Sequence, residues 1–530
     1  MPARREPVIE PAVPTRREPV SAPPVPTRRE PERILCAAAL RLGRLVLVGL
    51  LGAALVLRPR SARAQAAPPA PHEDIAFDFM NLLSRDGLHD LDRELWNAYG
   101  QCTYISSWKL PFQAPYTNAD GSIKSLAPDA ERSFTASFTL FFGVRLWPGA
   151  EAYLVPEVIS ERALSGLNGI GGSIQNFELQ KSGGETPQLY RARTFLHQTI
   201  GLGGKPVVKT SDPMQLGATV GSRRLVLTAG TFTILDVFDR NGVTGDPRQT
   251  FLNMAFMTHA SWDFAADARG YSLGATAELY WDDWAARIGR MAPPLHPNVL
   301  PITLDLANRY ADAIELEHDH VVLDRPGAVR VLAYRNQEVT GRFDDAIAAL
   351  EMDPTKNAAA CPQTPPQTSG NSGNFRAPDV CWVRKLNTKV GVGVNVEQYL
   401  TRDVGVFFRG MYSDGQTEVD AFNSADRSLS FGAVGKGGAW GRPFDVAGLG
   451  FGASFISDLH ARYLAMGGID GFVGDGHLRQ APEMVADAFY SFNLLKAIWL
   501  TADYQRLWNP GFNADRGPVD ILAGRAHLEF

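Results

Sequence analysis

Acidic and histidine side chains of the types that catalyse reactions or bind metals cluster between residues 315 and 320. Glu315 and Glu317 are two positions apart, so a strand would place both carboxylates on one face. Glycoside hydrolysis needs carboxylates on two sides of the bond, which such a pair does not provide. In Glu317-His-Asp-His320, His318 would face away from both glutamates, and a turn is the expected setting. We therefore predict neither a metal site nor a catalytic pair here.

Two other stretches imitate ligand-binding motifs. Residues 236–246 are rich in aspartate, but Val237 occupies position 1 and Arg248 position 12 of the corresponding calcium loop, so a polar turn is expected. The glycines of Gly448-Leu-Gly-Phe-Gly452 lack the βαβ context of a dinucleotide site and predict closely packed or lumen-facing strand positions. The sequence contains no G-x-S-x-G, H-E-x-x-H or P-loop motif. We predict no cofactor and no enzymatic activity.

The elements that would position these side chains alternate between apolar and polar residues. In Ser133–Arg145 the even-numbered positions from Phe134 to Val144 are apolar, and most odd-numbered positions are polar. The same period of two recurs in Tyr271–Tyr280, Lys389–Glu397, Glu483–Phe492, Ile498–Gln505 and Ile521–Phe530. Strands of a soluble sandwich are commonly about five or six residues long, whereas these run to about ten, with aromatic residues near the ends of their apolar faces.

This pattern predicts an all-β fold, a transmembrane antiparallel β-barrel. We expect 16 strands, with 14 to 18 acceptable, a size that leaves an aqueous lumen. The last segment places Leu522, Ala526 and Phe530 on one face, opposite Arg525. An amphipathic strand that ends on an aromatic residue is the signal that outer-membrane assembly machinery commonly recognises. We therefore expect that machinery and outer-membrane lipid as partners.

The N-terminal region predicts export. Residues 45–57 form a 13-residue apolar run, preceded by arginines and followed by Ala64-Gln65-Ala66. It indicates a signal peptide cut after Ala66, with a membrane anchor as the alternative. The expected domains are 1–66, a low-complexity extension with the signal peptide; 67–95, a periplasmic linker with a short helix near Asn81 to Leu91; and 96–530, the barrel.

Composition and cysteine content narrow the function classes further. The 530 residues are 45% hydrophobic and 21% charged, and the net charge of -5 offers no basic surface for nucleic acid. Four cysteines do not form a disulfide framework in so long a chain. Cys361 and Cys381 bracket a segment rich in Pro, Ser, Asn and Gly, so we expect a disulfide between them, with two free thiols as the alternative. Cys102 stands alone.

Several blocks in order along the chain resemble the carbohydrate-selective porins of the OprB type, over roughly residues 96–530. They are Gly143–Gly149, Pro156-Glu157, Asp236–Asn241, Trp262–Tyr271, Asp414-Gly415, Asp426–Ser428, Trp440–Pro443, Tyr463–Gly468, Asp503–Gln505, Asn509–Gly511 and Arg516–Pro518. The resemblance implies an outer-membrane barrel through which sugars, glucose-like ones among them, diffuse passively into the periplasm. The N-terminal extension and the loop between the two cysteines depart from the simplest pattern.

If the apolar residues face lipid, the alternate charged residues face the lumen. These candidates for the sugar path are Arg145, Glu157, Glu278, Arg287, Glu315, Glu317, Arg330, Glu397, Arg409, Asp503 and Arg525. Guanidinium donors and carboxylate acceptors of both signs suit a neutral sugar, although structural ion pairs that brace the wall are an equal alternative. Trp440 beside Arg442 is the candidate for an aromatic sugar contact, with an interfacial tryptophan as the alternative. Segments 181–191 and 353–380 could each cover the external mouth.

Two other functions remain open at this point. One is a general porin or a channel for another small solute. The other belongs to a different class, an exported β-protein that binds or hydrolyses carbohydrate. A barrel would depend on detergent and change its gel migration on heating, whereas a soluble protein would do neither.

Overall fold

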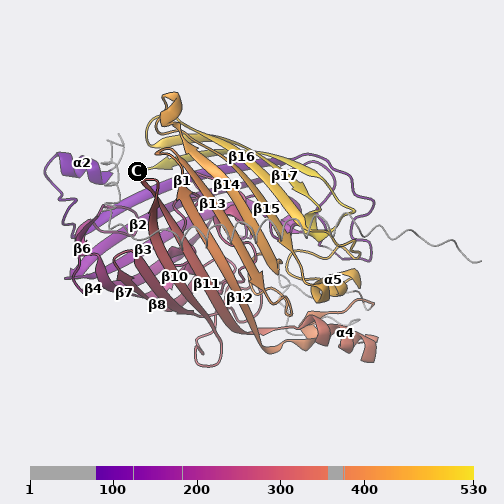
Figure 1. Ribbon diagram of the computed structural model, residues 1–530. Helices are drawn as coiled ribbons and strands as arrows, with labels where there is room; N and C mark the ends of the chain where they lie inside the picture. Colours follow the sequence, from indigo (N-terminus) through magenta and orange to yellow (C-terminus); the bar gives the residue numbers. More distant parts are fainter. Residues whose placement is uncertain (1–78, 123, 182, 356–373, 375) are drawn as a thin grey trace, which may run out of the picture. The chain divides into compact units, whose positions relative to one another are not determined.

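The computed structural model describes residues 79–122, 124–181, 183–355, 374 and 376–530. Sixteen antiparallel strands of this part close into a barrel in which β18 pairs with β1 (Figure 1). The barrel strands are β1 (Trp96–Lys109), β2 (Glu131–Trp147), β3 (Ala150–Arg162), β4 (Gln188–Gly201), β7 (Arg223–Phe232), β8 (Ser272–Trp281), β9 (Trp284–Met291), β10 (Tyr310–Val322), β11 (Arg325–Thr340), β12 (Lys385–Tyr399), β13 (Val404–Ser413), β14 (Arg427–Lys436), β15 (Val446–Phe455), β16 (Glu483–Asn493), β17 (Ile498–Trp508) and β18 (Val519–Glu529). The predicted 16-stranded barrel is confirmed.

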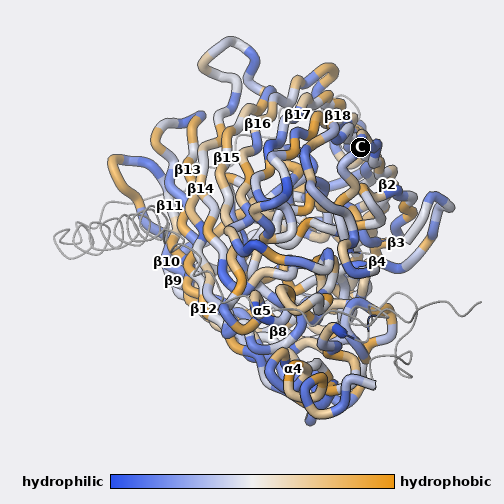
Figure 2. The backbone as a smooth tube through the Cα atoms, turned by 90° about the vertical axis from the view of Figure 1, so that its right-hand side faces the viewer, coloured by the Kyte–Doolittle hydropathy of each residue, from blue (hydrophilic) through white to orange (hydrophobic). Residues whose placement is uncertain are grey.

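The alternation in sequence becomes an outer and an inner face. On β12, Val390 and Val392 are 45% and 48% exposed on the outside, whereas Lys389 is 6% exposed and points inward. On β18, Leu522 lies on the outer face and Arg525 on the inner face. The alternating orange and blue along strands such as β13 and β14 in Figure 2 follows this pleat. A strand with one apolar face is stable only if lipid or a core covers that face, and closure pairs every strand edge.

The two ends of the barrel differ in the length of their connections. Tight turns such as 148–149, 282–283 and 323–324 join strands at the end that carries the C-terminus. The connections at the other end are long, and they carry α4 (Phe343–Met352) and α5 (Asp458–Ala465) (Figure 1). Outer-membrane barrels have short periplasmic turns and longer extracellular loops, so the C-terminal end is the periplasmic one.

Two small elements lie at the periplasmic end. The short helix expected near Asn81 to Leu91 is α2 (Phe79–Arg85), which starts earlier and ends sooner. It ends because Gly87 adopts a left-handed backbone, φ 70°, and the amide of Leu88 bonds the carbonyl of Leu83 at 2.9 Å. The connection from β4 to β7 forms a separate two-stranded sheet of β5 (Pro206–Lys209) and β6 (Ala218–Gly221).

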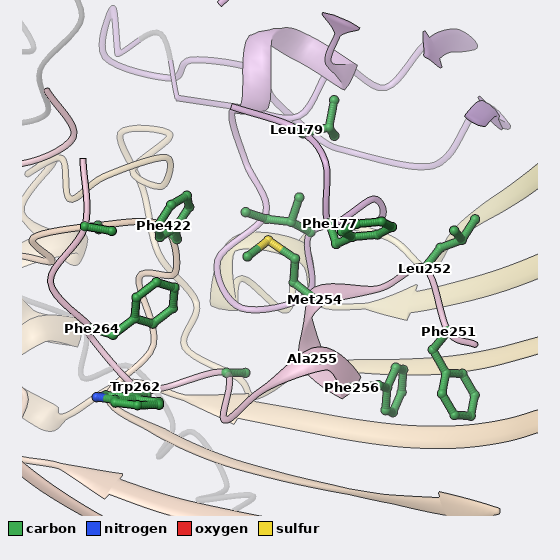
Figure 3. Packing of buried hydrophobic residues seen from close by; sticks show 14 of the residues in the cluster. Phe177, Leu179, Phe251, Leu252, Met254, Ala255, Phe256, Trp262, Phe264 and Phe422 are labelled. Atoms are coloured by element: carbon green, nitrogen blue, oxygen red, sulfur yellow. The ribbon is translucent and has the colours of Figure 1, made fainter. Parts of the chain in front are cut away.

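Two long extracellular connections, 163–187 and 233–271, fold into the barrel and form its core. Figure 3 shows Phe177 of the first connection beside Met254 of the second. Phe251 lies 5.8 Å from the ring of Phe407 on β13 and 4.9 Å from that of Phe489 on β16, between ring centroids. Residues 163–187 and 233–271, the inserted loops, therefore occupy much of the lumen.

The turn expected at Glu317–His320 is wrong, because β10 continues to Val322. His318 lies on the outer face, as the alternation alone would place it, and its ring stacks on Trp284 with centroids 4.3 Å apart. No described group of three or more His, Cys, Asp or Glu side chains is arranged to hold a metal ion. Within the described residues, no helix is both long enough and apolar enough to cross a membrane.

Candidate functional site

The barrel encloses a cavity of about 1400 Å³ between its wall and the inserted loops. Wall residues from β2 to β15 border it on one side, and residues 233–250 of the second inserted loop border it on another. Small-molecule pockets commonly measure about 300–1,000 Å³, so this cavity has room for a sugar together with water. Six of the predicted path residues line it: Arg145, Glu278, Arg287, Glu317, Arg330 and Glu397.

Five of these six form a row of alternating charge across β8 to β12. Arg287 on β9 lies 3.2 Å from Glu278 on β8 and 3.2 Å from Glu317 on β10. Arg330 on β11 pairs with Glu317 and lies 3.5 Å from Glu397 on β12. Neighbouring strands are about 4.8 Å apart, which is why inward side chains of successive strands reach one another. This charged row presents donors and acceptors to the cavity while its members hold one another in place.

An aromatic side chain accompanies the row. The ring of Tyr280 on β8 lies under the guanidinium of Arg224, 3.9 Å from the ring centroid. Its hydroxyl donates to Glu278 at 2.6 Å. Tyr280 lines the same cavity, as do Tyr271 and Tyr399. The cavity therefore combines flat apolar faces with charged hydrogen-bonding groups.

Arg145 lies apart from this row, toward the periplasmic end of β2. Its guanidinium donates to the backbone oxygen of Glu94 at 2.8 Å and lies 3.3 Å from Glu151. It lines the cavity while binding the segment that precedes the barrel.

Arg409 and Arg525 face inward as predicted, but an inserted loop covers both. Arg409 on β13 donates to the carbonyl of Phe256 at 2.7 Å and lies 3.3 Å from the carboxylate of Asp239. Arg525 on β18 donates to the carbonyls of Pro247 and Thr250 at 2.7 and 2.9 Å. Both guanidinium groups hold the second inserted loop against the wall.

Glu157, Glu315 and Asp503 are also buried on the inner wall, but they do not themselves line the cavity. Glu315 accepts a hydrogen bond of 2.8 Å from the amide of Asp239 and lies 2.8 Å from Arg287. Glu157 lies 3.4 Å from Lys181 of the first inserted loop. Asp503 accepts from the side-chain amide nitrogen of Gln505 at 3.0 Å. The alternation gave the correct side of each strand, but it could not show which positions the loops cover.

The structure places Trp440 and Arg442 outside the pore, which corrects their expected role in sugar contact. Both lie in the periplasmic turn between β14 and β15. The indole nitrogen of Trp440 lies 3.2 Å from the hydroxyl of Tyr490, which is exposed on the outer face of β16. Arg442 pairs with Asp445 at 2.5 Å and lies over the ring of Phe492. This geometry is that of an interfacial tryptophan, the alternative that the sequence left open.

The sequence reasoning missed the inserted loops as the elements that narrow the lumen. It also missed Arg193 on β4, whose guanidinium makes a two-point contact with Asp236 at 2.7 and 2.8 Å beside the cavity. The segment Phe251–Met257 contained a usable signal: it is apolar without a period of two, so it does not suit a lipid-facing strand.

The predicted disulfide can be followed only in part. Cys381 is disulfide-bonded, whereas Cys361 lies outside the described residues, as do the predicted leader and its cleavage site after Ala66. The pairing of Cys361 with Cys381 therefore remains a prediction. Cys102 is a free thiol on the outer face of β1.

A solved outer-membrane protein shares this architecture. The chain superposes on the high-pH structure of Pseudomonas putida OprB with a TM-score of 0.60 and 15% identity, covering 86% of this chain and 97% of that one. It aligns with the outer membrane channel DcaP of Acinetobacter baumannii with a TM-score of 0.44 and 11% identity, over 82% and 97% of the two chains. No curated protein sequence matches the chain. A family profile described as carbohydrate-selective porin, OprB family, matches residues 124–530; the chain belongs to this family and is an outer-membrane porin through which sugars diffuse passively.

Proposed function

We propose that sugars, glucose-like ones among them, cross the barrel through the 1400 Å³ cavity and exchange hydrogen bonds with the charged row of Glu278, Arg287, Glu317, Arg330 and Glu397. The row itself carries the proposal, because it places acidic and basic groups alternately along one wall. Arginine offers only donors and an ionised carboxylate only acceptors, so a sugar hydroxyl can satisfy both of its roles at the same wall.

Diffusion also requires that binding stays weak. The ion pairs keep each charge partly neutralised, so a passing sugar exchanges hydrogen bonds with groups that already have partners. The nearby ring of Tyr280 offers a flat face to the C–H surface of a sugar. A general diffusion pore is the second candidate, and the volume of the cavity, larger than that of common small-molecule pockets, favours it.

Liposome swelling with refolded protein separates these candidates. Swelling rates are compared for neutral monosaccharides, disaccharides and size-matched amino acids. We expect sugars to enter faster than amino acids of equal size, and Arg330→Gln to reduce that ratio about three- to tenfold, the equivalent of one hydrogen bond of about 1 kcal/mol. Arg335→Gln on the outer face of the same strand is the matched control.

Folding of each variant is checked by its heat-modifiable gel migration. Entry ranked by size alone in the wild type would reduce the function to general diffusion. If Arg330→Gln leaves the ratio of sugar entry to amino-acid entry unchanged, the charged row only stabilises the barrel wall.

Export and assembly belong to the same proposal. A signal peptide cut after Ala66 would deliver the chain to the periplasm, and the strand that ends at Phe530 would then engage the assembly machinery. N-terminal sequencing of protein purified from outer membranes tests the cut, and any mature N-terminus other than Ala67 contradicts it.

A further inference from the structure

The connection between β4 and β7, residues 202–222, is longer than the neighbouring periplasmic turns; residues 202–208 are exposed, whereas its tip contacts the inner wall. Its β5–β6 hairpin is closed by mutual backbone hydrogen bonds between Asp212 and Gln215 at 3.0 and 2.9 Å. The amide of Leu216 donates to the hydroxyl of Tyr153 on the inner wall at 3.1 Å. Residues 212–216 of this hairpin line the cavity, and so do Tyr399 and Lys436 near the periplasmic ends of β12 and β14. The hairpin therefore borders the periplasmic exit.

Glu94, just before β1, holds this hairpin in place. Its carboxylate is fully buried and accepts hydrogen bonds from the Ser211 hydroxyl and the Gly217 amide, both at 2.6 Å. The imidazole of His89 lies 3.0 Å from the same carboxylate. Removing this acceptor would leave the Gly217 amide without a partner, which is costly in a buried setting.

Two neighbouring residues reinforce this attachment. Asn97 on β1 donates to the carbonyls of Gln215 and Asp212 at 2.9 and 3.3 Å. Gly217 packs so closely that a side chain there would overlap the carbonyl of Leu91. The hairpin is thus fixed by side chains that have no place in the charged row.

The hairpin also brings a positive charge to the exit. Lys209 at the end of β5 lines the cavity together with Arg224 of β7 and Arg240 of the second inserted loop. In the described part of the structure, none of the three forms an ion pair with a carboxylate. Burial, followed by the positive charges of Arg224 and Arg240, lowers the pKa of the Lys209 ammonium. The carboxylates of Glu278 and Glu151 oppose this shift. Three cations that crowd together without a direct ion pair attract anions.

We propose that residues 202–222 form an exit filter, in which Glu94 positions a hairpin that narrows the periplasmic end of the pore and Lys209 favours anionic solutes. The favoured class is small solutes that bear a carboxylate or a phosphate, including sugar acids and sugar phosphates. This inference rests on the proposed route through the cavity and adds to it a second selective zone, separate from the charged row.

The charge part is tested by single-channel recording in planar bilayers under a potassium chloride gradient. We expect Lys209→Glu to lower the chloride-to-potassium permeability ratio about twofold or more, because it reverses a charge at a narrow point. The matched control is Lys205→Glu, an exposed position on the same hairpin that does not line the cavity. Equal ratios in Lys209→Glu and Lys205→Glu would overturn the assignment of charge selectivity.

The positioning part is tested with Glu94→Ala and with a chain in which residues 206–221 are replaced by a short Gly-Ser linker. Both should conduct more than the wild type and admit larger sugars in liposome swelling. Glu185→Ala, an exposed extracellular glutamate, is the control. If Glu94→Ala does not fold, the linker variant still tests whether the hairpin narrows the exit, and Lys209→Glu still tests the charge selectivity.

Failure of the two proposals can be told apart. A wild-type protein that forms no channel contradicts the proposed route itself. A conducting wild type with unchanged conductance and size limit in the linker variant contradicts only the exit filter.

Discussion

The guanidinium of Arg409 on β13 donates a hydrogen bond of 2.7 Å to the carbonyl oxygen of Phe256, in the middle of the second inserted loop. The same group lies 3.3 Å from the buried carboxylate of Asp239. The positive charge of Arg409 on the wall and the negative charge of Asp239 in the loop are both buried, and each compensates the other. This ion pair therefore joins the wall to the loop. Much of the narrowing of this porin depends on such contacts between a strand and a loop distant in sequence.

Arg409→Met should loosen the second inserted loop. It leaves Asp239 buried without its guanidinium, and loss of one member of a buried ion pair costs about 3–5 kcal/mol, part of which the other donors to Asp239 offset. We expect a lower midpoint of denaturant unfolding in detergent and a higher, noisier single-channel conductance. Arg427→Met, on the outer face of β14, is the control. Wild-type conductance and midpoint in Arg409→Met would contradict the anchoring role.

The barrel itself could be predicted from the sequence, because lipid imposes a period of two on every strand. Val390 and Lys389 face opposite sides as that period requires. The glycines at Gly448 and Gly450 were predicted to be lumen-facing or closely packed, and the rings of Phe489 and Phe256 indeed pack where their side chains would be.

The alternation did not predict which residues of the inner face the inserted loops cover. Arg409 and Arg330 cannot be told apart in the sequence, because each is an arginine at a position that the alternation places on the inner face. Only one of them borders the cavity, because Phe256 and its neighbours cover the other. Loop packing depends on contacts between residues more than a hundred positions apart, and a local period carries no information about them. Trp440 was misplaced for a related reason: its turn folds outward, beside Tyr490.

Gly100→Leu should impair closure of the barrel. The ring of Phe530 lies where a side chain at Gly100 would be, and the two residues exchange backbone hydrogen bonds of 2.8 and 3.0 Å. Overpacking of this kind typically costs about 1–3 kcal/mol, and it falls on the strand pair that closes the sheet. We expect a smaller heat-modifiable fraction after refolding. Ala98→Leu, on the same face of β1, should refold like the wild type; an equal loss in both variants would show that bulk on β1, rather than the Phe530 contact, is responsible.

The disulfide of Cys381 should join it to Cys361. Non-reducing peptide mapping by mass spectrometry should find these two cysteines in one cross-linked peptide, with Cys102 alkylated as a free thiol. Cys361→Ser should then release one additional thiol, on Cys381. A cross-link from Cys381 to any other cysteine would refute the pairing.

The extracellular helix α5 should be held more firmly at acidic pH. His460 of α5 lies 3.0 Å from the carboxylate of Asp426 and 3.3 Å from that of Asp470, and its ring stacks on Phe343 of α4. Burial acts to lower the pKa of His460, but the two carboxylates outweigh it and the pKa is raised above 6.5, with Lys389 opposing them. For Asp470, burial itself raises the pKa, to about 6, against the opposing positive charges of His460 and Lys389.

Both shifts act in the same direction. A histidine with a raised pKa in the folded state stabilises the fold below its unfolded pKa, and this contribution is lost as pH rises through the folded value. An aspartate with a raised pKa also stabilises its protonated form, and that contribution is lost between about pH 4 and 6. Hydrogen–deuterium exchange of residues 457–466 should therefore be slower at pH 6 than at pH 9 once the intrinsic pH dependence is removed. His460→Gln should lose most of this difference between pH 6 and 9; if it keeps the full difference, other groups are responsible.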